Sequence, residues 1–109
     1  MEKGITYKPL PKEVTVKESI IHGLGLFTTE DVEEGHKFGV SHVVDFRFKT
    51  GYIRTPLGGF INHSEEPNCE LVLNLNEHWR ELISIKHIPK GTEITTKYSL
   101  DRGWNEPTN

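Results

Sequence analysis

A group of hydrogen-bonding side chains follows a short apolar stretch in residues 59–69, which read GFINHSEEPNC. Asn62 and His63 carry amide and imidazole groups that are costly to bury without hydrogen-bond partners. We therefore expect them to hold either a ligand or nearby backbone. Asn62 could also cap a turn, and a single histidine is commonly structural, so this segment alone leaves both interpretations open.

Two other segments carry residues suited to binding or catalysis. The glycines of Gly23-Leu24-Gly25 permit close backbone approach, which would serve a cofactor or a tight turn, but they lack the third glycine and the helix of a dinucleotide-binding loop. Tyr98 ends an alternating segment, residues 92–98, where a strand tyrosine would bury its ring. Trp104 lies in a polar stretch and would either fold back on the body or cover a ligand.

Short strands separated by turns are expected to position these residues. β-branched runs, alternation and turn glycines predict a mainly β chain without a long helix. We expect a hairpin in which 43–48 and 52–54 flank a turn at 49–51. The other extended segments are expected at residues 14–17, 26–29, 37–40, 71–76, 83–85 and 94–98.

Bulk properties indicate one small globular domain. The chain has 109 residues, 34% of them hydrophobic and 27% charged. We expect an N-terminal arm (1–13), a single domain (14–104) and a short tail (105–109). No apolar run approaches the roughly 18 residues of a membrane span, and residues 1–8 lack the apolar core that a secretory signal would have. A cytoplasmic or nuclear protein is expected.

Charge and cysteine content restrict the partners. The net charge of −3 and the lack of a basic stripe argue against nucleic acid as a direct partner. The single Cys69 excludes an internal disulfide and a cysteine zinc cluster, and the six histidines do not fall at zinc-binding spacings. No metal site is expected.

Taken in order, three segments resemble the motifs of the SET domain of protein-lysine methyltransferases. Residues 19–27, SIIHGLGLF, resemble the first motif. Residues 60–64, FINHS, with PNC at 67–69, resemble the second, and residues 91–98, GTEITTKY, resemble the third. The resemblance covers residues 14–104 and implies a β-clip fold of short curved sheets. It also implies a C-terminal pseudoknot that brings the second and third motifs together.

The resemblance also implies a chemistry, methyl transfer from S-adenosylmethionine to the ε-amine of a lysine in a histone or another basic protein. Tyr98 would be the active-site tyrosine, and Tyr52 and Phe60 are candidates for the substrate channel, although strand packing suits Tyr52 equally. The residues implied to contact the cofactor are His22, Gly23, Leu24, Gly25, Asn62, His63 and, over the adenine, Trp104.

Three departures from the family pattern qualify these expectations. Glu65 stands where the family often has a zinc-linked cysteine, which indicates a zinc-free variant, and Lys97 stands where an aspartate is common. If the last strand is regular, Lys97 faces away from Tyr98. Residues 39–59 leave little room for the family's variable insert, as in short viral and bacterial members. The apolar hairpin left uncovered predicts a homodimer.

Three functions remain open at this point. The leading one is a protein-lysine methyltransferase. The short insert motivates a second, a non-catalytic SET-like module that binds a peptide or protein partner. A third is a methyltransferase that acts on a small amine.

Overall fold

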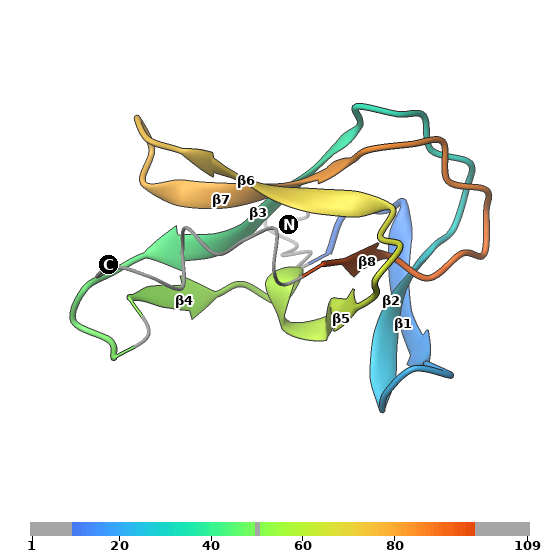
Figure 1. Ribbon diagram of the computed structural model, residues 1–109, viewed down its shortest axis with the longest axis horizontal. Coiled ribbons are helices and arrows are strands. Elements are labelled where there is room, and N and C mark those ends of the chain that lie inside the picture. Colours follow the sequence, from blue (N-terminus) through green and yellow to red (C-terminus); the bar gives the residue numbers. More distant parts are fainter. Residues whose placement is uncertain (1–9, 50, 98–109) are drawn as a thin grey trace, which may run out of the picture.

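The fold consists of three small sheets (Figure 1). The structure is a computed structural model that describes residues 10–49 and 51–97. One short 3-10 helix, η2 (Gly58–Phe60), lies within this part of the chain, so the prediction of a mainly β protein is confirmed. The strands are β1 (Val14–Glu18), β2 (Leu24–Thr28), β3 (Lys37–Val44), β4 (Tyr52–Arg54), β5 (Asn62–His63), β6 (Cys69–Asn74), β7 (Trp79–Ser84) and β8 (Thr95–Thr96).

The sheets differ in the sequence distance between their strands. β1 and β2 form an antiparallel hairpin, and the four-stranded antiparallel sheet has the order β4-β3-β7-β6. β5 and β8 pair in parallel, although the chain passes through β6 and β7 between them. In Figure 1 this short pair lies between the four-stranded sheet and the β1–β2 hairpin. Segments far apart in the sequence therefore meet at the centre of the molecule.

One hydrophobic core serves all three sheets. Leu26 of β2, Leu82 of β7 and Ile94, next to β8, are fully buried, as is Ile88 in the β7–β8 connection. The remaining buried apolar residues are Val14, Val32, Phe38, Leu57, Ile61, Cys69 and Leu71. Burial of this apolar surface is the main force that holds the three small sheets together.

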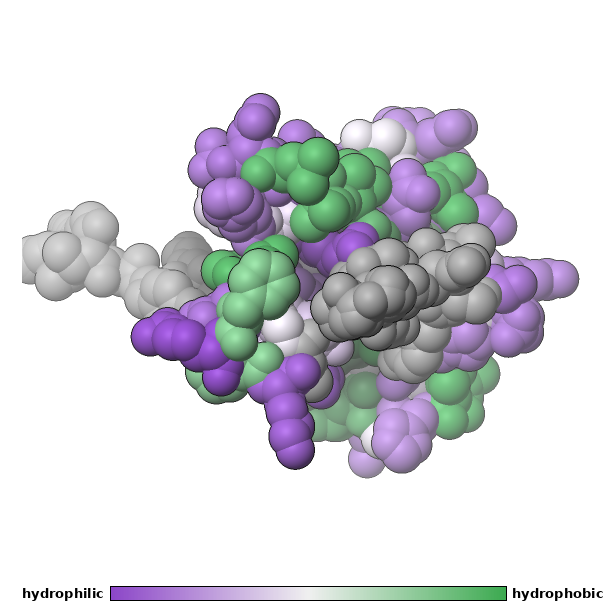
Figure 2. Space-filling model, turned by 60° about the vertical axis from the view of Figure 1, so that its left-hand side comes forward, coloured by the Kyte–Doolittle hydropathy of each residue, from purple (hydrophilic) through white to green (hydrophobic). Residues whose placement is uncertain are grey.

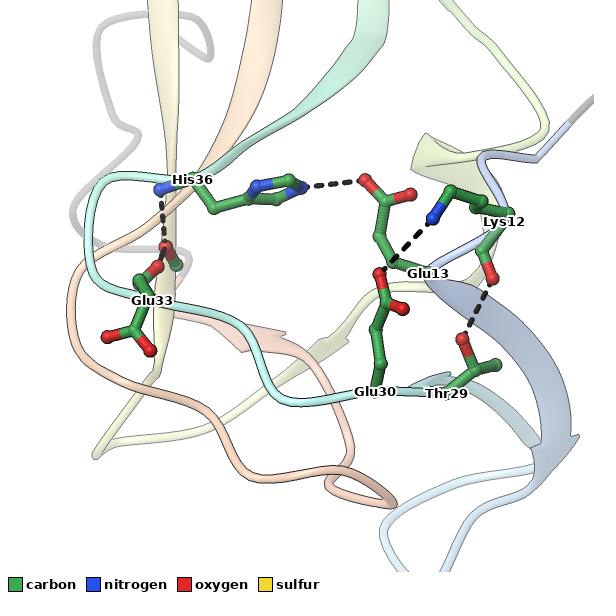
Figure 3. Close-up of polar contacts among 7 residues, drawn as sticks. Lys12, Glu13, Thr29, Glu30, Glu33 and His36 are labelled. Atoms are coloured by element: carbon green, nitrogen blue, oxygen red, sulfur yellow. Dashed lines mark hydrogen bonds and ion pairs between the residues drawn. The ribbon is translucent and has the colours of Figure 1, made fainter.

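The connection between β2 and β3 fastens the β1–β2 hairpin to the four-stranded sheet (Figure 3). The His36 ring Nε2 lies 2.6 Å from a carboxylate oxygen of Glu13, which precedes β1. The His36 backbone N–H donates to Ser84 Oγ on β7 at 2.8 Å, and the Ser84 hydroxyl donates to the Glu33 carbonyl at 2.6 Å. These contacts lie away from the glycine loop and fix the hairpin that carries it.

The predicted hairpin at residues 43–54 forms, but with a longer turn. β3 ends at Val44, whereas the sequence predicted a strand to Phe48. The Asp45 carboxylate accepts a hydrogen bond from the Arg47 backbone N–H at 3.0 Å, and side-chain contacts of this kind compete with a strand ladder. Phe46 and Phe48 consequently lie in the turn, and Phe46 is 80% exposed.

Alternation predicted β6 correctly as a strand, but it placed the next strand at 83–85, whereas β7 spans Trp79–Ser84. It also did not identify the buried face of either strand. In β6, Leu71 is buried whereas Leu73 and Leu75 are exposed, because the strand extends past the core and Leu75 lies beyond its end. In β7 the buried face consists of Arg80, Leu82 and Ser84, two of which are polar. Ile83 lies on the other face and is only partly covered. Among the residues described, no helix is long and apolar enough to cross a bilayer.

Candidate functional site

The pairing of β5 with β8 places the second and third sequence motifs side by side. Asn62 is opposite Thr95 and His63 is opposite Thr96. The Ser64 N–H donates to the Thr96 carbonyl at 2.9 Å and extends the pairing by one step. A pair of strands this short depends on its surroundings for stability, and the buried Thr95 and Thr96 anchor it in the core.

The η2 turn sets the position of Asn62 by packing against β3. Gly58 lies so close to the Ser41 carbonyl that a Cβ atom at this position would overlap the carbonyl oxygen. Thr55, just before the turn, donates from its N–H to the Ser41 carbonyl at 2.9 Å and from its hydroxyl to the Val40 carbonyl at 2.7 Å. The backbone that enters β5 is therefore held against the four-stranded sheet.

The Asn62 side chain joins the second motif to the first and the third. Its Nδ2 donates to Glu93 Oε2 at 2.8 Å, to the His22 carbonyl at 3.1 Å and to Ser19 Oγ at 3.2 Å. Because the two closest partners can only accept, the orientation of the amide is determined. The Asn62 Oδ1 atom has no hydrogen-bond partner among the residues that the structure describes, so it remains an available acceptor.

Glu93 and Ser19 complete this junction, and the sequence analysis gave neither a role. The Ser19 hydroxyl donates to Glu93 Oε1 at 2.8 Å and accepts the Ile21 backbone N–H at 2.8 Å. Asn68 supports Glu93 from the other side by donating from Nδ2 to the Glu93 carbonyl at 2.8 Å. Both residues lie in the motif segments 19–27 and 91–98, but no local pattern indicated that their side chains would contact each other.

The two glycines of the first motif are required for different structural reasons. Gly23 has φ +46°, which glycine tolerates well, and a Cβ atom there would meet open space. A Cβ at Gly25 would instead overlap the Glu93 carboxylate. Gly25 is therefore needed for the close approach of Glu93, and Gly23 for the turn that leads into β2.

His63 and the two unusual residues of the motifs form a chain of polar contacts. The His63 ring Nε2 lies 2.8 Å from Glu65 Oε2, and Lys97 Nζ lies 3.2 Å from Glu65 Oε1. Hydrogen bonds from His63 and Lys97 lower the pKa of the Glu65 carboxyl group. The two departures from the family pattern, Glu65 and Lys97, thus contact each other, and they link the end of β5 to the residue after β8.

The structure locates the other predicted site residues only in part. The backbone of His22 and Leu24 lies beside Asn62, and the Phe60 side chain packs against the core. Tyr52 makes an edge-to-face contact with His42, with ring centroids 5.0 Å apart, so strand packing accounts for the contact seen. Tyr98 and Trp104 lie outside the described residues. Within residues 10–49 and 51–97, no group of three or more His, Cys, Asp or Glu is arranged to hold a metal ion.

Comparison with known families assigns the fold. The family model described as SET domain matches residues 40–99, more than half of the chain. The protein therefore belongs to the SET-domain family.

Individual relatives agree with this assignment. The histone-lysine N-methyltransferase, H3 lysine-9 specific KMT1, of Fusarium mangiferae is 32% identical over an alignment of 88 residues that covers 75% of this chain and 24% of that protein. This chain thus spans about a quarter of the length of that curated relative. The methyltransferase domain of human PR domain-containing protein 2 has a TM-score of 0.64 at 19% identity, with 80% of this chain and 77% of that one covered. A chain of a humanized mutant Polycomb Repressive Complex 2 from Chaetomium thermophilum has a TM-score of 0.65 at 26% identity, with 81% and 15% covered.

Proposed function

We propose that this protein is a methyltransferase that uses S-adenosylmethionine to methylate the ε-amine of a lysine in a protein. The observation that carries the proposal is the Asn62–Glu93–Ser19 junction, which joins all three motifs beside the glycine loop. Membership of the SET family and the histone-lysine methyltransferase named among the relatives support the same activity. A basic protein such as a histone is the proposed substrate, in the cytoplasm or the nucleus.

The residues at the junction fit this cofactor. S-adenosylmethionine carries an ammonium group that needs acceptors, and Asn62 Oδ1 together with backbone carbonyls of residues 22–25 would supply them. The open space at Gly23 leaves room beside the loop. His63 is proposed to lie near the adenine, with Trp104 as its cover. When bound, the cofactor supplies a methyl group on a positively charged sulfur.

The main task of the protein residues is to present a neutral lysine in line with that methyl group. A lysine amine with an ordinary pKa of ~10.4 is almost wholly protonated at pH 7. Forming the neutral amine at this pH therefore costs about 4–5 kcal/mol. A nearby positive charge and an apolar channel lower the pKa of the amine and favour loss of its proton to water. Tyr98 is proposed to hydrogen-bond the lysine amine and to orient the nitrogen lone pair towards the methyl group that the cofactor would supply. Correct positioning of the two reactants can contribute roughly 7–11 kcal/mol.

Calorimetric titration with S-adenosylmethionine, followed by transfer of a radiolabelled methyl group to histones, tests the proposal. We expect Asn62→Ala to weaken cofactor binding by about tenfold, the effect of losing roughly one good hydrogen bond. Tyr98→Phe should retain cofactor binding but reduce labelling by about a hundredfold, as for loss of a group that acts on a reacting amine. A folded protein that does not bind the cofactor would contradict this proposal.

One observation favours a second candidate, a SET-like module that binds a peptide or protein without catalysis. Only the short β3–β4 hairpin, with a turn at residues 45–51, stands where the family's insert is expected. Such a module would bind lysine peptides but transfer no label with the cofactor present. A methyltransferase acting on small amines would instead label low-molecular-weight amines and leave proteins unlabelled.

A further inference from the structure

The Glu93 carboxylate is partly buried, and no cationic side chain among residues 10–49 and 51–97 pairs with it. Both of its side-chain contacts, with the Ser19 hydroxyl and the Asn62 amide at 2.8 Å each, come from neutral donors. In the described part of the chain, no Lys, Arg or His nitrogen lies within ion-pair distance of it. By contrast, Glu13 and Glu81, which are also largely covered, each pair with a histidine or lysine.

Two lysines of the described residues make contacts with groups other than the Glu93 carboxylate. The backbone of Phe27 forms a β-bridge with that of Glu93. The Lys17 ammonium lies over the Phe27 ring, 4.9 Å from its centroid, and makes no ion pair with the Glu93 carboxylate in the described part of the chain. Lys97 pairs with Glu65. Within the described part of the chain, the negative charge of Glu93 thus lies uncompensated beside the first motif and next to Asn62.

A partly buried carboxylate that is held only by neutral donors keeps its negative charge uncompensated, and it attracts a ligand that brings the opposite charge. The cofactor and its product differ in their positive charge. S-adenosylmethionine has a sulfonium and an ammonium against one carboxylate, whereas S-adenosylhomocysteine has lost the methyl group together with the sulfonium charge. Both ligands keep the ammonium group and have nearly the same shape, so a fixed negative charge distinguishes them only through the sulfonium, a difference to which packing responds little.

We propose that Glu93 is a specificity residue whose charge makes the site prefer the cationic cofactor over the uncharged thioether product. This inference rests on the proposed function and adds to it, because the same carboxylate would favour product release after the methyl group has moved. The alternative is that Glu93 only orients Asn62 and Ser19. In that case its charge would not matter, and its loss would weaken both ligands alike.

The test is calorimetric titration of both ligands into the wild-type protein and into Glu93→Gln. Glutamine keeps the shape, since its oxygen can accept from Asn62 while its NH₂ donates to Ser19 Oγ. We expect the ratio of the two affinities, cofactor to product, to fall by about three- to tenfold, as for removal of one charge at a partly solvated site. Glu70→Gln, which removes an exposed charge from β6, should leave the ratio unchanged.

An unchanged ratio in a folded Glu93→Gln protein would overturn the inference, whatever the effect on the absolute affinities. If the wild-type protein bound neither ligand, the proposed function would fail as well, and the two failures are thus distinguishable. A salt series on the wild-type protein covers the case in which Glu93→Gln does not fold. The wild-type preference for the cofactor should decrease as salt screens the carboxylate, and a salt-independent ratio would also overturn the inference.

Discussion

At the scale of single residues, burial controls the charge of His42. This side chain on β3 is 3% exposed, and its Nδ1 lies 2.8 Å from the Ser41 hydroxyl. Burial, together with the positive charges of Arg54 and Arg80, lowers the pKa of His42 from 6.5 to about 4. The folded protein therefore holds His42 neutral at pH values where the unfolded chain would protonate it.

This difference predicts a pH dependence of stability. Because the folded-state pKa is the lower one, the contribution is complete above pH 6.5 and is lost as the pH falls from 6.5 towards 4. His42 alone should lower the free energy of unfolding by about 3 kcal/mol over this range. This loss adds to any decrease caused by protonation of carboxylates. Urea unfolding at several pH values measures the His42 contribution as the difference between the pH profiles of the wild type and His42→Gln.

His78→Asn is the matched control, because His78 is exposed and has φ +62°, a conformation that asparagine tolerates. The free energy of unfolding of the His78→Asn variant should follow the same pH dependence as that of the wild type. Parallel profiles for wild type and His42→Gln would show that His42 is not the group responsible.

The sequence identified Asn62 as a residue that holds something, but it left the partner open. The structure supplies two partners directly, since the Asn62 amide binds Glu93 and Ser19, which are 31 and 43 positions away in the chain. Local sequence patterns contain no information about contacts at such separations. For the same reason Glu93, a single carboxylate before a strand, carried no sequence signal for its place at the junction.

At the scale of elements, the η2 turn provides a direct comparison between adjacent glycines. A Cβ at Gly58 would overlap the Ser41 carbonyl, which is backbone and cannot rotate away, whereas a Cβ at Gly59 would meet open space. Gly58→Ala should therefore destabilise the protein by about 1–3 kcal/mol, while Gly59→Ala should change stability little. For a domain of this size, about 1 kcal/mol corresponds to a shift of roughly 4–8 °C in Tm.

Thermal unfolding followed by circular dichroism separates the two variants. Because η2 leads into β5, Gly58→Ala should also weaken cofactor binding, and Gly59→Ala should not. Equal Tm values for both variants would mean that η2 is not packed against β3 as the structure places it.

Elements with strong local signals were predictable, whereas those made by tertiary contacts were not. Local patterns sufficed for β1, for β6 and for the turn at Gly91, which has φ +83°. The single strand β3 was predicted as two segments, 37–40 and 43–48, because its register shifts leave no continuous alternation. The β5–β8 pair contains two residues in each strand, too few for any periodicity. The end of β3 was missed because the Asp45 side chain, and not the hydrophobic pattern, terminates the strand.

At the scale of the whole molecule, the order of the three motifs predicted the family and the adjacency of β5 and β8. That information is not local, since it comes from a resemblance extending over the whole domain. The pseudoknot and the positions of Tyr98 and Trp104 depend on residues outside the described part, so they remain predictions.

The β3–β4 hairpin leaves apolar side chains uncovered on one end of the molecule. Val43 is opposite Ile53 on β4 and opposite Trp79 on β7, so these three side chains share one face of the four-stranded sheet. Ile53 is 40% exposed, and Phe46 in the adjoining turn is more exposed still. Figure 2, in which the hairpin turns come forward, shows apolar groups at the surface between polar ones. Exposed apolar surface of this kind is typical of an interaction site.

We expect this hairpin to mediate self-association into a homodimer. Sedimentation equilibrium of the wild-type protein at tens of micromolar, roughly the range of moderate homodimer affinities, should show a dimer. Phe46→Ser combined with Ile53→Thr should shift the protein towards monomer, because both changes remove apolar area from the proposed interface. Leu75→Ser is the control, since Leu75 is 73% exposed but lies at the β6–β7 turn. A strictly monomeric wild type would exclude the homodimer, and an equal effect of Leu75→Ser would point to non-specific association instead of a defined interface.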